Sequence, residues 1–408
     1  GAIAVSGAIG ATQALAGLDV TNSNGATFTG AVTVNDGSGV LDLSDTEDNQ
    51  DITFGGDVSA VTLTTTANAY DLIFQENVTV TNDVTFAAIR NLDLGGATDD
   101  VATFTGGLDT ATNVTGTVTV AGTINTTNTQ MDIGAVTLAA ATTLDTGNAA
   151  AGILNVGAVT SGTNALTLDS GSTGGATIGL TSFADATGGL TIRDAGGLAT
   201  IGAVGSGTAG NVTITNSQAG VTFSSTVDAG TLLLTDTTGT VTVQGNLAAT
   251  TLTTANAAYN VQFDEDVTIT NDASFLNTGT VALGSANDDV LLFGGGINTA
   301  GAGTNPSGTT LAGILRTSAD QVDLGGVTLG ANSVIDSTNN GGSAAGAAIN
   351  VASVDADNAG SNDRTLTLNS GTGGAIAVSG AIGATQALAG LDVTNSNGAT
   401  FSGAVTVN

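Results

Sequence analysis

Residues 374–408 repeat residues 1–35 at every position but one, and the single difference is Thr29 against Ser402. Gly374 therefore corresponds to Gly1, and the chain re-enters its own beginning after one long period. Self-similarity of this kind is the sequence signature of repeat architectures, in which each unit stacks on its neighbours. We therefore interpret the chain as a window of a tandem array, with residues 1–373 as one period and residues 374–408 as the start of the next.

A second, more diverged duplication lies inside the long period. Residues 62–107 align without gaps with residues 251–296, and half of the aligned positions are identical. The identities include one Tyr, three Phe and a pair of adjacent acidic residues. The period is thus predicted to contain two related halves, approximately residues 1–189 and 190–373.

The secondary structure is predicted from short runs in which Val, Ile, Leu or Phe alternates with Thr. Examples are NVTVTN at 77–82, NVTITN at 211–216 and GTVTVQG at 239–245. Period-two alternation places the aliphatic side chains on one face of a strand and the hydroxyls on the other. Asn-Gly, Asp-Gly and Gly-Gly pairs between the runs are typical of turns. With 41% hydrophobic residues in such runs, we expect an ordered all-β chain rather than a disordered one.

Two all-β architectures compete, a string of β-sandwiches and a β-solenoid. Sandwich domains usually bury Trp or several large aromatic residues, whereas this chain has no Trp, only 3% aromatic residues and 61 Gly. We therefore favour an elongated β-solenoid (parallel β-helix) built from tandem repeats. Coils of about 20–30 residues give about 12–19 coils in each period. Strands are then expected to pair with their equivalents in neighbouring coils, with like side chains in ladders and Thr and Asn outside.

The composition excludes most catalytic chemistry. The chain has no His, Cys or Lys, so it cannot form a Ser-His-Asp triad or a typical zinc site. We therefore expect a protein that is not an enzyme; paired carboxylates acting on a polysaccharide, at Asp99 and Asp100 or at residues 264–266, are the remaining catalytic alternative. A net charge of −31 disfavours nucleic acid and anionic membranes as partners. No apolar run is long enough to span a bilayer.

Clustered carboxylates make calcium the one plausible cofactor, because calcium prefers oxygen ligands. GGATDDVAT at 95–103 and GSANDDVLL at 284–292 partly match the calcium-binding nonapeptide, although Thr98 and Asn287 replace a required Gly. The alternative is that these acids occupy solvated turns. The candidate calcium ligands are Asp42, Asp45, Glu47, Asp48, Asp51, Asp99, Asp100, Asp264, Glu265, Asp266, Asp288 and Asp289.

Stretches such as GAIAVSGAIGATQALAGLDVTNSNGATFTGAVTV and NVTITNSQAGVTFSSTV resemble the repeat regions of giant bacterial surface proteins. These are the filamentous-haemagglutinin-like and autotransporter-like β-solenoids of fibres and adhesin stalks. The resemblance covers essentially the whole chain in composition and rhythm. It implies secretion, display at the cell surface and an adhesive or scaffolding role, including in a biofilm matrix. Secretion and membrane-anchoring domains of that family are not seen in this sequence.

We therefore expect a non-catalytic structural segment of an extracellular filament or adhesin stalk. Its expected partners are further copies of itself along the fibre axis, in tandem or head to tail, together with neighbouring fibres or cell-surface glycans. The alternative function is a calcium- or glycan-binding adhesive module. No nucleic-acid partner and no membrane span are expected.

Overall fold

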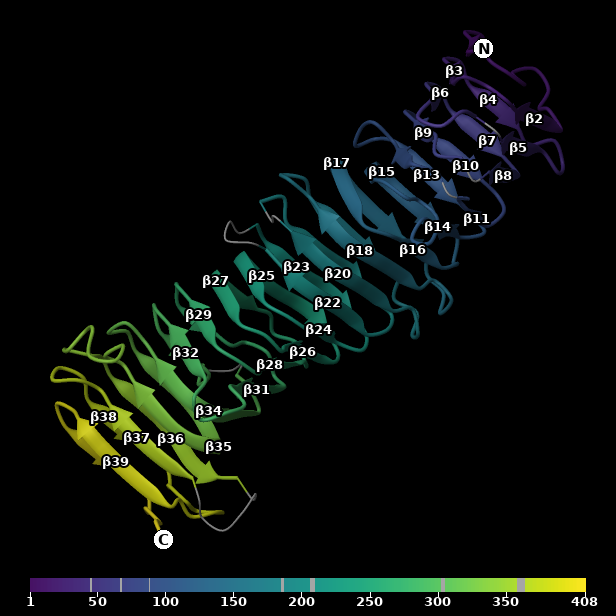
Figure 1. The fold of residues 1–408 in the computed structure, drawn as a ribbon. Helices are drawn as coiled ribbons and strands as arrows, with labels where there is room; N and C mark the ends of the chain where they lie inside the picture. Colours follow the sequence, from purple (N-terminus) through teal and green to yellow (C-terminus); the bar gives the residue numbers. More distant parts are fainter. Residues whose placement is uncertain are drawn as a thin grey trace. The chain divides into compact units, whose positions relative to one another are not determined.

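All the regular structure in the described residues is β-strand, and the strands of successive coils pair in parallel (Figure 1). The fold is a β-solenoid of about 17 turns, as the alternating runs and the repeats predict. The computed structural model describes residues 1–44, 46–66, 68–87, 89–184, 187–205, 210–301, 305–357 and 364–408.

The chain divides into two compact units, each a stack of coils. Unit 1 comprises residues 1–202 and 216–218, and unit 2 comprises residues 203–215 and 219–408. The strands β22 (Ala199–Val204) and β23 (Val212–Ser217) contain the unit boundaries. The other strands of unit 1 are β1 (Ile3–Val5), β2 (Gly17–Val20), β3 (Ala26–Phe28), β4 (Val32–Val34), β5 (Val40–Leu43), β6 (Asp51–Phe54), β7 (Val58–Ala60), β8 (Thr62–Thr65), β9 (Asp71–Phe74), β10 (Val78–Val80), β11 (Val84–Thr85), β12 (Asn91–Leu94), β13 (Val101–Phe104), β14 (Leu108–Asp109), β15 (Val118–Thr126), β16 (Met131–Ile133), β17 (Val136–Asp145), β18 (Leu154–Thr160), β19 (Leu166–Asp169), β20 (Ile178–Ala184) and β21 (Leu190–Asp194).

Unit 2 has the same construction as unit 1, with short and long strands in alternation with turns. Its other strands are β24 (Val221–Phe223), β25 (Val227–Thr237), β26 (Thr240–Val243), β27 (Leu247–Thr254), β28 (Asn260–Phe263), β29 (Val267–Ile269), β30 (Ala273–Ser274), β31 (Thr280–Leu283), β32 (Val290–Phe293), β33 (Ile297–Asn298), β34 (Gly308–Arg316), β35 (Val322–Asp336), β36 (Ile349–Ala356), β37 (Thr365–Asn369), β38 (Ile376–Val378), β39 (Gly390–Asn395) and β40 (Ala399–Phe401).

The register of strand pairing gives the coil length, which varies along the chain. In unit 2, Val221 pairs with Val241 and Val241 with Val261, so these two coils are equally long. The coil that leads from Val281 to its partner Thr309 is clearly longer. The paired strands keep their alignment although the segments between them differ in length. This variation prevents a single repeat length from appearing in the sequence.

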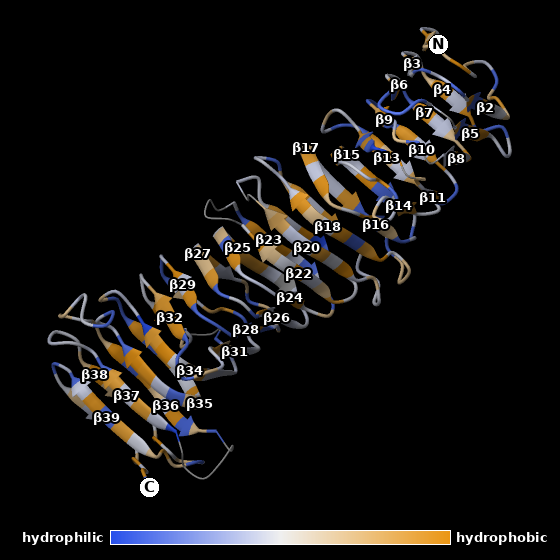
Figure 2. Ribbon diagram, viewed as in Figure 1, coloured by the Kyte–Doolittle hydropathy of each residue, from blue (hydrophilic) through white to orange (hydrophobic). Residues whose placement is uncertain are grey.

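The core of each unit is filled by alternate residues of the strands. In β10, for example, Val78 and Val80 are fully buried whereas Thr79 is exposed. Hydrophobic segments run along the strands in both units (Figure 2). The inward positions are mostly Val, Leu, Ile and Ala, as predicted, because these side chains fit the narrow space between facing strands.

Large aromatic residues form ladders in the core. The rings of Phe28, Phe54 and Phe74 stack at centroid distances of 5.0 and 5.2 Å with interplanar angles of 9°. They occupy equivalent positions of three successive coils, since Phe28 pairs with Phe54 and Phe54 with Phe74. The uneven sequence spacing of these residues therefore reflects coils of different length, since the three residues occupy the same position within their coils. Each stacked pair contributes about 0.5–1.5 kcal/mol beyond its buried area.

Asparagine side chains on the outer face link neighbouring coils. Nδ2 of Asn77 donates to Oδ1 of Asp57 at 3.0 Å, and Nδ2 of Asn155 donates to Oδ1 of Asp132 at 2.6 Å. These residues lie 20 and 23 positions apart in the sequence, which is one coil in each case. Such bonds hold the outer surface in the same register as the core.

The internal duplication is also visible in the strands. Strands β9 to β14 in unit 1 and β28 to β33 in unit 2 have equal lengths, and corresponding strands begin at the same offset as the residues of the sequence alignment. An outer hydrogen bond is repeated as well: Nδ2 of Asn82 donates to Oγ1 of Thr62 at 2.8 Å, and Nδ2 of Asn271 donates to Oγ1 of Thr251 at 2.9 Å. The two copies therefore share secondary structure and side-chain contacts. The division of the period into two halves remains a prediction.

The only two tyrosines of the chain are equivalent residues of this duplication, and both are buried. The hydroxyl of Tyr70 donates to the carbonyl of Leu43 at 2.7 Å, and that of Tyr259 to the carbonyl of Leu234 at 3.2 Å. Burial disfavours the phenolate, so it raises the pKa of Tyr259 to about 12 and that of Tyr70 further still.

We predict that Phe54→Ala destabilises the coils that contain β3, β6 and β9 by about 3–5 kcal/mol, because it removes the central ring of the stack and leaves a cavity. Hydrogen exchange of the amides in these strands measures the effect locally. The control Thr53→Ala, at a half-buried outward position, is expected to change stability by less than about 0.5 kcal/mol. Equal losses of protection in the two variants would contradict a special role of the ring stack.

We also predict that the free energy of unfolding falls as the pH rises above about 10. The unfolded chain then loses its phenolic protons while the folded chain, with raised pKa values, keeps them. Ultraviolet titration of phenolate in the folded protein should accordingly be delayed toward strongly alkaline pH. Tyr70→Phe and Tyr259→Phe together should remove this part of the pH dependence. Phenolate formation near the ordinary pKa of tyrosine without unfolding would contradict the prediction.

Candidate functional site

The first predicted calcium cluster extends from β5, which contains Asp42, to Asp51 at the start of β6. Asp42 accepts a hydrogen bond from Oγ1 of Thr64 at 2.7 Å, and Asp48 accepts one from the amide of Ala69 at 3.0 Å. These contacts tie each carboxylate to the next coil. Glu47 and Asp51 are exposed at the surface. Asp45 lies outside the described residues.

The second and third predicted positions are turns of the same geometry in the two copies of the duplication. Oδ2 of Asp100 accepts hydrogen bonds from the amides of Gly96 and Ala97 at 2.6 and 2.7 Å. Asp289 repeats this arrangement with the amides of Ser285 and Ala286, at 2.7 and 2.9 Å. Both aspartates are only 6% exposed. Each aspartate therefore closes its own turn by accepting hydrogen bonds from backbone amides three and four residues earlier. Their neighbours Asp99 and Asp288 are exposed.

The remaining predicted cluster, residues 264–266, follows β28. Asp264 accepts a hydrogen bond from Nε2 of Gln262 at 2.7 Å, and Asp266 accepts one from the amide of Val290 at 2.7 Å. Glu265 is exposed. Here too, the two aspartates fix local strand and coil geometry.

No three carboxylates within the described ranges form a group that would hold a metal ion. The calcium sites therefore stay a prediction from the sequence. What the contacts establish is a structural role for Asp42, Asp48, Asp100, Asp264, Asp266 and Asp289.

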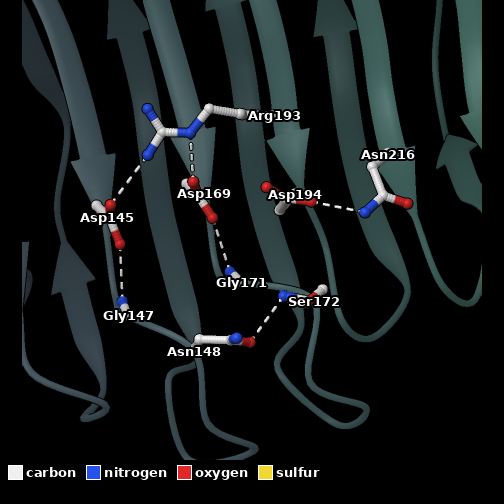
Figure 3. Close-up of polar contacts among 9 residues, drawn as sticks. All are labelled: Asp145, Gly147, Asn148, Asp169, Gly171, Ser172, Arg193, Asp194 and Asn216. Carbon is white, nitrogen blue, oxygen red and sulfur yellow. Dashed lines mark hydrogen bonds and ion pairs between the residues drawn. The ribbon is translucent and has the colours of Figure 1, made fainter.

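One polar group in unit 1 is a row of three aspartates with one arginine, which we call the aspartate ladder (Figure 3). Asp145, Asp169 and Asp194 lie at the ends of β17, β19 and β21, and strand pairing aligns Asp145 with Asp169 and Asp169 with Asp194. Arg193 donates through Nε to Oδ2 of Asp169 and through Nη2 to Oδ2 of Asp145, the latter at 2.9 Å. One guanidinium thus bridges carboxylates from two preceding coils.

Other oxygens of the aspartate ladder accept hydrogen bonds from two backbone amides and from an asparagine side chain. Oδ1 of Asp145 accepts from the amide of Gly147 at 2.8 Å, and Oδ1 of Asp169 accepts from the amide of Gly171 at 2.7 Å. Oδ1 of Asp194 accepts from Nδ2 of Asn216 at 2.6 Å. A hollow of about 270 Å³ borders the ladder and is lined also by Asn148 and Ser172.

Burial and hydrogen-bond donors shift the pKa of the carboxylates in unit 1 in opposite directions. Burial raises the pKa of Asp169, and the hydrogen bonds from Gly171 and Arg193 oppose this rise without cancelling it. The pKa of Asp71 is instead lowered: burial raises it, but the hydrogen bonds from Arg90 and Asn91 outweigh that effect. Arg90 holds Asp71 through Nε and Nη2, each at 2.6 Å.

Sequence reasoning missed these arginine pairs. Arg90 lies 19 positions after Asp71, and Arg193 lies 24 and 48 positions after Asp169 and Asp145. These separations correspond to one or two coils. The pairs could therefore be predicted from the sequence only if the coil length were known. The sequence offers no single coil length, and the pairs therefore remain hidden in it.

Unit 2 also has hollows that acidic and amide side chains border. One, of about 430 Å³, is bordered by Asp228, Asn246 and Asp266, and another, of about 350 Å³, by Asp272 and Asp320. They contain carboxylates and amides on successive coils. Such surfaces offer hydrogen-bond acceptors and negative charge to solvent, with no nucleophile–base pair of the kinds that use His, Cys or Lys.

Comparisons with family models, curated proteins and solved structures find no match for this chain. Among the described residues, no helix is long and apolar enough to cross a membrane.

We predict that Arg193→Met weakens the coils of the aspartate ladder by up to about 1 kcal/mol near neutral pH. The effect is small because the Arg193 side chain is 43% exposed and its ion pairs are screened by solvent. The loss should disappear as the pH falls and the carboxylates become protonated, since the guanidinium then has no charge to balance. Hydrogen exchange of β17, β19 and β21 at neutral and acid pH measures this difference.

Arg193→Lys is the matched control for that experiment. It keeps the positive charge but loses the planar fork that reaches two carboxylates at once, so an intermediate effect is expected. A pH-independent loss in the Met variant would indicate that Arg193 acts through packing of its aliphatic part instead of through charge.

Proposed function

We propose that the chain is a non-catalytic structural segment of a secreted filament or adhesin stalk displayed at the cell surface. The observation that carries this proposal is the parallel pairing of each coil with the next in both units. In such a fold each coil packs mainly against its neighbours, so further periods extend the structure without rearranging the coils that are already present. The tandem repeat that restarts at Gly374 supplies a sequence for such extension.

The surface chemistry supports the same role. A net charge of −31 keeps neighbouring chains apart and soluble while the hydrophobic core remains inside each coil. Only four basic residues are present, which leaves few sites for trypsin-like proteases in an extracellular setting. The absence of His, Cys and Lys from the chain supports a mechanical role over a catalytic one.

The partners that we propose are further copies of the same sequence along the fibre axis. Neighbouring fibres and cell-surface glycans are proposed as lateral partners, and the polar hollows of both units supply acceptors for them. We propose that calcium screens repulsion between these strongly acidic fibres.

The proposal predicts that antibodies raised against the recombinant chain label filaments outside the cells that produce the protein. Immunogold electron microscopy of intact cells provides the measurement, and pre-absorption of the antibody with the recombinant chain provides the control. Label confined to the cell interior, or spread over particles that are not filaments, would reject the proposed function. The same images with and without millimolar calcium test whether the ion bundles the filaments.

A further inference from the structure

The arginine at the end of β34 has no acidic partner within the described part of the chain. Arg90, Arg193 and Arg364 each form an ion pair with aspartate. Among the described residues none forms an ion pair with Arg316, and its Nε is buried without a hydrogen-bond partner. A guanidinium has five N–H groups, and a buried donor that stays unpaired lowers stability. This is unexpected in a chain with 35 acidic and only four basic residues.

The aspartate that strand pairing aligns with Arg316 is engaged elsewhere. Arg316 of β34 lies opposite Asp336 of β35. Oδ1 of Asp336 accepts hydrogen bonds from the amide and the hydroxyl of Thr338, at 2.8 and 2.6 Å, and Oδ2 accepts one from the amide of Asn340 at 2.8 Å. Both carboxylate oxygens therefore hold the turn that follows β35. The donors of Arg316 are left for a ligand.

Aliphatic side chains surround Arg316 on the outer face of its sheet. In β32, which is hydrophobic along its whole length (Figure 2), the first and third residues are half-buried and the other two are fully buried. Alternation therefore directs Val290 and Leu292 outward. Strand pairing places Leu292 beside Arg316, and Ile314 between Val290 and Val334. We call these outward residues the Arg316 patch: Val290, Leu292, Ile314, Arg316 and Val334.

The duplicate of this region in unit 1 has polar residues in the same places. β13 corresponds to β32 in the sequence alignment, and β13 pairs with β15 as β32 pairs with β34. Three positions of the patch differ: Thr103 stands for Leu292, Thr123 for Ile314 and Asn125 for Arg316. The stacking of coils thus requires neither the aliphatic side chains nor the arginine. Outward aliphatic groups around an unpaired cation are features of a binding surface.

The chemistry of the patch specifies a ligand with a carboxylate beside an apolar surface. A guanidinium binds a carboxylate through two parallel hydrogen bonds, each assisted by charge. The ligand must nevertheless carry little negative charge overall. Oδ1 of Asp266 accepts a hydrogen bond from the amide of Val290, and Asp336 lies opposite Arg316, so further negative charges on the ligand would be repelled.

We propose that the Arg316 patch binds an acidic glycan in which uronic acids alternate with neutral, N-acetylated sugars. The carboxylate of one uronic acid pairs with the guanidinium of Arg316. The acetamido methyl group and the C–H face of the adjacent sugar lie against Leu292 and Ile314. This inference rests on the proposed function, which has cell-surface glycans as lateral partners, and adds to it the binding site and the class of sugar.

A second copy of this chain is the competing occupant, because its surface also carries carboxylates. Each copy has a net charge of −31, so two copies repel each other along any lateral contact. A glycan with one carboxylate for every two sugars brings far less negative charge to the same surface. The charge balance therefore favours the glycan.

Calorimetric titration of the full chain with a tetrasaccharide of alternating glucuronic acid and N-acetylglucosamine tests the proposal. We expect saturable binding at one site per chain. The tetrasaccharide of N-acetylglucosamine alone is the matched neutral ligand. It should bind at least about tenfold more weakly, because it lacks the charge-assisted hydrogen bonds. Equal affinities for the two ligands, or no binding of the acidic one at millimolar concentration, would overturn the inference.

Substitutions locate the site. Arg316→Gln should reduce the affinity for the acidic tetrasaccharide to that for the neutral one and leave the latter unchanged. Leu292→Thr with Ile314→Thr, which installs the side chains of unit 1, should weaken binding of both ligands. Asn125→Gln, at the position equivalent to Arg316, is the control and should change neither affinity. Equal losses in Arg316→Gln and Asn125→Gln would reject the site, and hydrogen exchange of β32, β34 and β35 verifies that each variant is folded.

Sedimentation of the chain without glycan tests the competing occupant. Self-association that Arg316→Gln abolishes would assign the patch to a second copy and overturn the inference. Binding is measured on the isolated chain, whereas the proposed function is tested by labelling of intact cells, so the two can fail separately. Labelled filaments without glycan binding would reject the inference and leave the proposed function standing. Glycan binding with label confined to the cell interior would do the reverse.

Discussion

Parallel pairing between successive coils is the constraint on which the rest of the structure depends. Each strand contributes one row of backbone hydrogen bonds to the coil before it and another to the coil after it. A shift of one residue would turn every inward side chain outward, so the hydrophobic core fixes the register strongly. Once the register is fixed, equivalent residues of neighbouring coils lie side by side, whatever their chemistry.

This alignment favours some side chains and penalises others. Alignment stabilises phenylalanine residues, since the rings of Phe28, Phe54 and Phe74 stack along the core. Alignment is unfavourable for aspartate residues, because Asp145, Asp169 and Asp194 bring like charges together at the ends of their strands. A bridging arginine and amide donors from adjacent turns offset that repulsion. Because the chain has few arginines, backbone amides and asparagine side chains satisfy many of the other acids.

Much of the fold follows from the sequence, whereas the polar contacts do not. Alternation in runs such as residues 77–82 predicts strands, and the lack of Trp together with the repeats favours a solenoid over sandwiches. Paired residues, however, lie a whole coil apart, and the coil that starts at Val281 is longer than the one that starts at Val221. Adjacent acids in the sequence, such as Asp99 and Asp100, look like a shared site. The two side chains point in different directions, as those of adjacent residues do. Asp100 accepts hydrogen bonds within its own turn and forms no shared site with Asp99.

Unequal coils have an evolutionary consequence. Because the paired strands hold their alignment across a segment that is longer than its neighbours, an insertion at one level leaves the levels above and below undisturbed. Loops can then lengthen, shorten and diversify independently while the hydrophobic interior is inherited intact. Evolution can therefore change the outer turns of such a molecule while it retains the scaffold beneath them.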